Sequence, residues 1–170
     1  MSRPGRLIPP AGAGFHGNVP PPRVTALSEQ LVQVHQALRE RLASLRADAT
    51  AVPDDLLGHC LSFCAALHTH HSGEDHQLFP ALQAAHPELA PIIVKLAEDH
   101  VLVAGILQQL RDLLAAPPDP ATLRRELDGL TAILESHFSF EERRTAAALD
   151  TLGPENSFPD VFAPDLKSAT

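Results

Sequence analysis

The feature that most constrains the fold is a 3-4 alternation of apolar residues that recurs in four stretches of the chain. The stretches run from about residue 24 to 47, from 53 at least to 79, from about 88 or 91 to 115, and from about 121 to 149. This spacing is typical of helices that bury one face, and short connections make successive helices antiparallel. The sequence therefore predicts an all-α fold, an up-down-up-down four-helix bundle.

Proline and glycine separate this bundle from the two ends of the chain. Residues 1–23 are rich in both, and such a composition disfavours helices and interior strands. We expect an irregular arm over residues 1–23, a bundle over residues 24–150 and an irregular tail over residues 151–170.

Single residues refine the helix ends and the core. Thr25 or Ser28 is the expected N-cap of the first helix, because a hydroxyl there can accept from free backbone N–H groups. Pro80 is expected to bend or end the second helix. Cys60 and Cys64 lie four residues apart in that helix and form no disulfide framework, so we expect free thiols that pack in the core.

The charge balance bears on partners and location. The formal net charge is -8, which disfavours nucleic acid and anionic membranes because both would repel the chain. No apolar run approaches the length of a membrane-spanning helix, and the first residues lack the apolar core of a secretory signal. We expect a cytoplasmic protein that binds neither nucleic acid nor membrane.

Polar residues interrupt the apolar face of each predicted helix. They are four histidines and two glutamates: His35, His70, Glu74, His100, His137 and Glu141. A buried carboxylate without a partner costs roughly several kcal/mol or takes up a proton, and no Lys or Arg lies on the traced faces to offset it. A bound metal would supply the missing charge. The alternative is a polar core in which the histidines hydrogen-bond to the glutamates.

Two of these helices carry the same His-x-x-x-Glu motif. The pairs His70–Glu74 and His137–Glu141 each place both side chains one turn apart on one helix face. Each helix can then bind one ion through its histidine and reach both ions through its glutamate. Imidazole and carboxylate ligands suit iron, manganese or zinc. The repeat therefore predicts a pseudo-symmetric site for two ions.

The motifs together resemble the hemerythrin and HHE cation-binding family. The resemblance is carried by His35, by HHSGEDHQLFP from His70, by AEDH ending at His100 and by HFSFEER from His137, and it covers roughly residues 25–150. It implies a non-haem di-iron centre, often oxo-bridged, that meets O2, NO or peroxide.

The chain departs from the oxygen carriers of that family at one position. Those proteins use two histidines one turn apart on the third helix, whereas Leu96 and Ala104 flank His100 here at that spacing. The site should then be one imidazole short, with His35 and His70 on one ion and with His100 and His137 on the other. A water, Glu98, Asp99 or an unexpected ligand could fill the gap.

A second pair, His71 and Asp75, lies about 100° round the helix from the traced face. We place both residues, together with Glu98 and Asp99, at the rim of the site, where they could orient ligands or admit protons.

The expected function follows from the open coordination positions, which favour reaction with small molecules over oxygen storage. We expect a protein that binds or reacts with NO, O2 or H2O2, in the handling of nitrosative or oxidative stress. The alternatives are an O2 carrier or sensor, and an iron-storage or metal-responsive module without catalysis.

Overall fold

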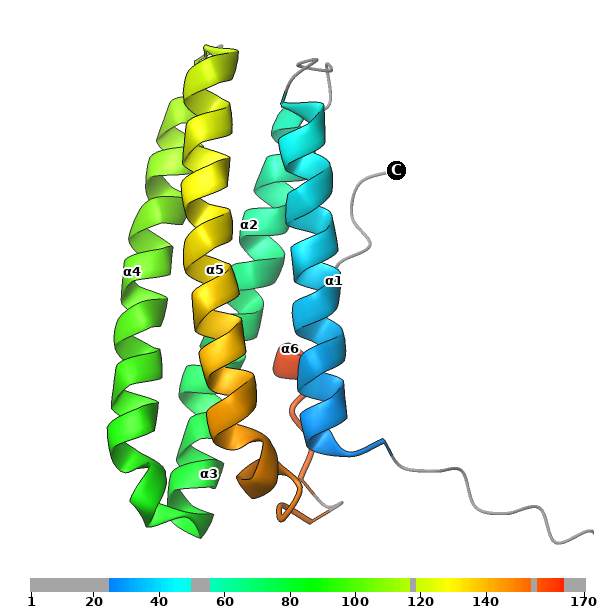
Figure 1. Ribbon diagram of the computed structural model, residues 1–170, viewed down its shortest axis with the longest axis vertical. Coiled ribbons are helices and arrows are strands. Elements are labelled where there is room, and N and C mark those ends of the chain that lie inside the picture. Colours follow the sequence, from blue (N-terminus) through cyan, green and yellow to red (C-terminus); the bar gives the residue numbers. More distant parts are fainter. Residues whose placement is uncertain (1–24, 50–55, 117–118, 154–155, 164–170) are drawn as a thin grey trace, which may run out of the picture.

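The computed structural model describes residues 25–49, 56–116, 119–153 and 156–163, and every regular element within these ranges is helical. The long helices are α1 (Leu27–Asp48), α2 (Leu56–Gly73), α4 (Ala90–Leu114) and α5 (Pro120–Leu149). They lie side by side as a helical bundle, in which α1 and α4 each contact both α2 and α5 (Figure 1). The prediction of an all-α fold is confirmed.

The second long helix does not continue as one regular α-helix to Pro80. A π-helical turn, Glu74–Leu78, follows α2, and α3 (Phe79–Ala85) then starts with Pro80 in its first turn. The Phe79 N–H donates to the Glu74 carbonyl, five residues back. Proline lacks an N–H and its ring crowds the preceding turn of an α-helix. The expected change in the helix therefore takes the form of this wider turn directly before Pro80, and a 3₁₀ turn, Pro87–Leu89, leads on to α4.

The predicted cap of the first helix is wrong. Ala26 occupies the N-cap of α1 and makes no side-chain cap hydrogen bond. Ser28 instead donates its backbone N–H and its hydroxyl to the Asp150 carboxylate, at 3.1 and 2.8 Å. The hydroxyl is thus used to tie the start of α1 to the end of α5. At the other end of α5, Asp119 accepts from the Thr122 N–H as a true N-cap.

Leucines from all the long helices fill the interior, and Phe63 and Phe138 are the largest side chains that are fully buried. Cys60 and Cys64 lie in this core as free thiols, as expected. Burial raises the pKa of Cys60 to about 12. A thiol that stays protonated is a poor nucleophile and a poor metal ligand, so these cysteines serve packing.

The segment that follows α5 is not wholly irregular, contrary to expectation. It contains the one-turn helix α6 (Pro159–Phe162), which packs against α1 and α2 and buries Val161 and Phe158 (Figure 1). The predicted arm over residues 1–23 lies outside the described residues. Among the helices that are described, none has the length and apolar character needed to cross a bilayer.

Candidate metal centre

The six residues predicted from the helix faces come together inside the bundle. His35 comes from α1, His70 from the end of α2, Glu74 from the π-helical turn and His100 from α4, while α5 supplies His137 and Glu141. All six are buried, and His35, His70, Glu74 and Glu141 are completely inaccessible to solvent. Apolar packing of the four long helices therefore forces two carboxylates and several imidazoles into one interior space.

On the side of α1 and α2, two imidazoles face each other. The His35 and His70 Nε2 atoms are 3.0 Å apart. Glu74 places its Oε1 atom 3.2 Å from the His70 Nε2, and Glu141 places its Oε2 atom 3.5 Å from the His35 Nε2. Two nitrogens and an oxygen of Glu74 thus lie within 4.8 Å of one another between these helices, and Glu141 approaches them at His35.

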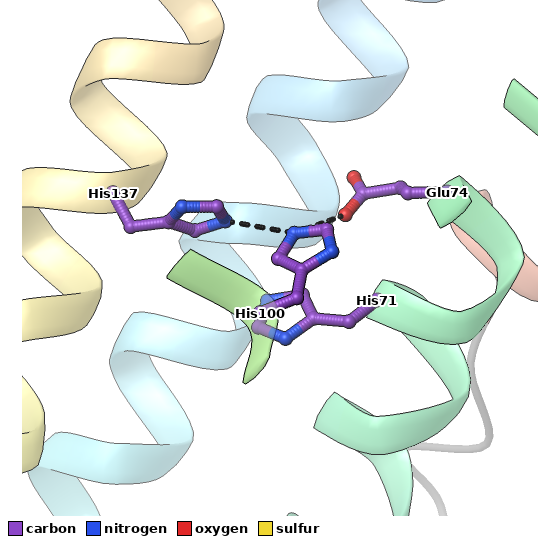
Figure 2. A group of neighbouring side chains, drawn as sticks. All are labelled: His71, Glu74, His100 and His137. Atoms are coloured by element: carbon purple, nitrogen blue, oxygen red, sulfur yellow. Dashed lines mark hydrogen bonds and ion pairs between the residues drawn. The ribbon is translucent and has the colours of Figure 1, made fainter. Parts of the chain in front are cut away.

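A matching arrangement lies on the side of α4 and α5. The His100 and His137 Nε2 atoms are 3.2 Å apart, and the second oxygen of Glu74 lies 3.4 Å from the His100 Nε2 (Figure 2). The Glu141 Oε2 atom, which approaches His35, is also 3.8 Å from the His137 Nε2. Both glutamates therefore lie between the two histidine pairs, and Glu74 offers one oxygen to each.

The carboxylates are not satisfied by hydrogen bonds from the described residues. No N–H or hydroxyl group of the described residues donates to the buried oxygens of Glu74 or Glu141, and the two carboxyl groups contact each other, where they could share a proton. Burial, together with the neighbouring Glu141, raises the pKa of Glu74 well above its usual value, and burial raises the pKa of Glu141 to about 8. This observation argues against the alternative of a satisfied polar core and for a cation between the two groups.

The imidazoles are held in the neutral form that binds metals. Burial lowers the pKa of His35, His70 and His71 well below the ordinary value, and neighbouring histidines add to the shift. Burial and the neighbouring His100 lower the pKa of His137 to about 4. At neutral pH these rings therefore carry lone pairs rather than positive charge, as a metal site requires.

Outer partners orient the imidazoles on the side of α1 and α2. The His35 Nδ1–H donates to the Glu142 carboxylate at 2.9 Å, and Arg39 donates to the same carboxylate oxygen. The His70 Nδ1–H donates to the backbone carbonyl of Val161, also at 2.9 Å. Because each acceptor can only accept, the proton sits on Nδ1 of each ring. The two Nε2 lone pairs then face each other across 3.0 Å, an arrangement that a cation bound to both nitrogens would stabilise.

On the side of α4 and α5, only one imidazole has an outer partner among the described residues. The His100 Nδ1–H donates to Asp75 at 2.8 Å, whereas Asp99 lies 3.8 Å from the His137 Nδ1, which is buried without a hydrogen-bond partner among the described residues. Asp75 and Asp99 both lie on the outer side of the histidines they accompany. Glu98 is exposed to solvent. Glu142 was not singled out from the sequence, although the Glu-Glu pair in HFSFEER parallels the Glu74–Asp75 pair and is the signal that could have identified it.

His71 differs most from expectation, since it lies in the cluster and not at its rim. It is buried, its ring stacks on His100 with centroids 4.1 Å apart, and its Nε2 atom has no hydrogen-bond partner among the described residues (Figure 2). The reason is that α2 packs against both α1 and α4, so its buried surface is wider than one seam. His70 faces His35 on α1, and His71 faces His100 on α4.

With His71 included, the potential ligand atoms divide into two sets. One set contains His35, His70 and Glu74, and the other contains His71, Glu74, His100 and His137; within each set the atoms lie within 4.8 Å of one another. Glu74 belongs to both sets. The donors are neutral imidazoles and carboxylates, and they fit divalent or trivalent transition-metal ions such as iron.

Comparison with known proteins agrees with this chemistry. The family model described as the hemerythrin HHE cation binding domain matches residues 26–149. The chain matches no curated protein and no solved structure. The family match spans most of the chain and contains every histidine and glutamate of the two sets. The chain therefore belongs to the hemerythrin HHE cation-binding domain family.

Proposed function

We propose that the chain is a four-helix, up-down-up-down bundle that holds a non-haem centre of two iron ions. The observation that carries the proposal is that Glu74 presents one oxygen to each of two histidine pairs, at 3.2 and 3.4 Å. A carboxylate in that position is suited to bridge two ions. The carboxylate of Glu141, placed between the same pairs, supports a second bridge.

The two halves of this centre would be unequal. His35 and His70 would hold one ion, while His71, His100 and His137 would hold the other. His71 would supply the imidazole that the third helix lacks. An open coordination position is therefore expected only on the ion held by His35 and His70. An iron pair supplies reversible electron transfer and a position for a small ligand, and we place that position on this side.

The ligands that fit this role are O2, NO and peroxide, and we propose that the protein binds or consumes them in nitrosative or oxidative stress. The chain's own contribution is to keep the site dry and the imidazoles neutral and oriented. A specific observation favours a second candidate, an O2 carrier or sensor. With His71 counted, the two sets contain five imidazoles and the carboxylate of Glu74, and Glu141 lies beside them, so the site is not one imidazole short.

The test of the centre itself is a metal analysis of the purified full chain combined with absorption spectra. The sequence has no Trp and no Tyr, which leaves the near-ultraviolet region clear for bands of an iron pair. We expect about two irons per chain and a band that dithionite bleaches and azide shifts. A chain that carries no metal, or one zinc with a featureless spectrum, would refute the proposal.

A second measurement separates the two candidate roles. The reduced protein is exposed anaerobically to NO or to H2O2 with an excess of an electron donor that does not itself react with these ligands, and separately to O2 followed by removal of O2. Consumption of NO or peroxide over repeated turnovers supports the stress-related role. A spectral change with O2 that reverses fully, without net oxidation and without turnover of the other ligands, supports the carrier or sensor.

A further inference from the structure

The short segment after α5 lies outside the matched family domain and yet reaches the metal centre. The domain match ends at residue 149, whereas α6 begins at Pro159. α6 packs against α1 and α2 (Figure 1), and its Val161 contacts His70 in the half of the site formed by His35 and His70. Val161 is completely buried and Phe158 nearly so, which shows that the segment is seated on the bundle.

One backbone atom of this segment contacts a site histidine. The Val161 carbonyl accepts from the His70 Nδ1–H at 2.9 Å. His35 and His100 are bonded at the same ring atom by carboxylates from the bundle itself, Glu142 and Asp75. His70 therefore takes its Nδ1 hydrogen-bond acceptor from a residue outside the matched domain, whereas His35 and His100 take theirs from residues inside it.

Gly73 makes room for this contact. It lies one turn after His70, and a Cβ atom there would meet the Asp160 Cβ and the Val161 backbone N at 3.0 Å each. Two of the three nearest atoms are backbone, so a side chain at this position would require the backbone of the segment to shift from α2 by a few tenths of an ångström. The neighbouring Gln77 donates to the Asp160 carboxylate at 2.9 Å and holds the segment from the next turn.

We propose that residues 156–163 are a positioning element of the metal centre, which holds His70 in the Nδ1–H tautomer with its Nε2 lone pair turned inward, and that Gly73 is the residue that admits it. The role in metal binding rests on the function proposed above. The fixed tautomer does not, because it follows from the contact with a carbonyl that can only accept.

The first test is Gly73→Ala in the full chain, with Gly129→Ala and Gly105→Ala as controls. Both controls are helical glycines with nothing within 4 Å of an added Cβ. Alanine favours a helix more than glycine does, so the controls should be neutral or slightly stabilising. In Gly73→Ala, iron should be lost to a chelator about 10- to 100-fold more readily, as is usual when an outer partner of a metal-bound histidine is lost.

A second readout needs no metal. Nitrogen-15 NMR of labelled histidines in the metal-free chain reports which ring nitrogen of His70 carries the proton. We expect the Nδ1–H tautomer in the unsubstituted chain and in both controls, and a mixture in Gly73→Ala. An Nε2–H tautomer in the unsubstituted chain would overturn the inference, as would a Gly73→Ala chain that matches the controls in both readouts.

Should Gly73→Ala fail to fold, Val161→Asp in the full chain gives the same test from the other side, because a carboxylate at this completely buried position should displace the segment from the bundle. Ala163→Asp, at an exposed position two residues later, is the matched control. We expect Val161→Asp to lose iron more readily than the control and to show a mixture of His70 tautomers. A Val161→Asp chain that matches the control in both readouts would contradict the inference. Absence of iron from the unsubstituted chain would refute the proposed function alone and leave the tautomer test standing.

Discussion

At the scale of single residues, Glu141 has the environment with the clearest consequence. It is completely buried, and its pKa rises from the ordinary 4.5 to about 8. The folded metal-free chain therefore keeps a proton that the unfolded chain releases between these two values. The protonated Glu141 therefore contributes to the free energy of unfolding in full below pH 4.5, and this contribution is lost as the pH rises through 8.

Glutamine at this position cannot lose the proton. We expect Glu141→Gln to be more stable than the unsubstituted chain above pH 8 in the metal-free form, by roughly a few kcal/mol, and to bind less metal. Urea unfolding at pH 9 with a chelator present measures the first effect, and metal analysis measures the second. Glu98→Gln, at an exposed position on α4, is the control and should change neither. Equal stability of Glu141→Gln and the unsubstituted chain at pH 9 would contradict the claim that ionisation of the buried Glu141 destabilises the metal-free fold.

His71 carries the second prediction at this scale. If it binds the ion shared with His100 and His137, His71→Ala should lower the iron content from two per chain toward one and change the spectrum. His68→Ala, three residues earlier on α2 and exposed, is the matched control and should leave both unchanged. An unaltered iron content in His71→Ala would return the residue to the outer role first predicted for it.

At the scale of helices, the effect of core packing on stability can be measured separately from metal binding. On α4, Leu107 is 2% exposed and Leu102 is 54% exposed. Leu107→Ala should lower the free energy of unfolding by about 2–5 kcal/mol, and Leu102→Ala by about 0.5 kcal/mol or less. Neither should change the iron content per folded chain. Denaturant unfolding checks the first statement, and a fall in iron content with Leu107→Ala would show that packing and metal binding are coupled this far from His100.

The same scale shows what could be predicted from the sequence. The six residues on the traced faces meet in the structure because the 3-4 alternation follows one face of each helix faithfully. His71 was misplaced because α2 has two neighbours and therefore buries more than one seam. The π-helical turn was not foreseen, since only Pro80 marks it in the sequence. The Val161 contact uses a backbone carbonyl, which every residue has and no motif can reveal.

For the whole molecule, metal and fold should stabilise each other. Burial opposes the ionisation of Glu74 and Glu141 in the metal-free bundle, and a bound cation would remove that cost. We expect chelation to lower the midpoint of thermal unfolding. Excess metal should restore it, and a free metal concentration 100 times the Kd is worth about 2.7 kcal/mol. Calorimetry with and without chelator measures the shift, and identical midpoints would mean that no cation belongs between the glutamates.

The contact between His70 and Val161 also sets an order of events during synthesis. It joins residues 91 positions apart, and the second partner leaves the ribosome only after the whole matched domain has been made. A nascent chain that ends at residue 149 already carries every side chain of the two ligand sets, yet its His70 ring still lacks its acceptor. If the proposed centre forms, His70 gains its acceptor only after Val161 has left the ribosome, so a chain that terminates before Val161 should hold its ions less tightly than the full chain.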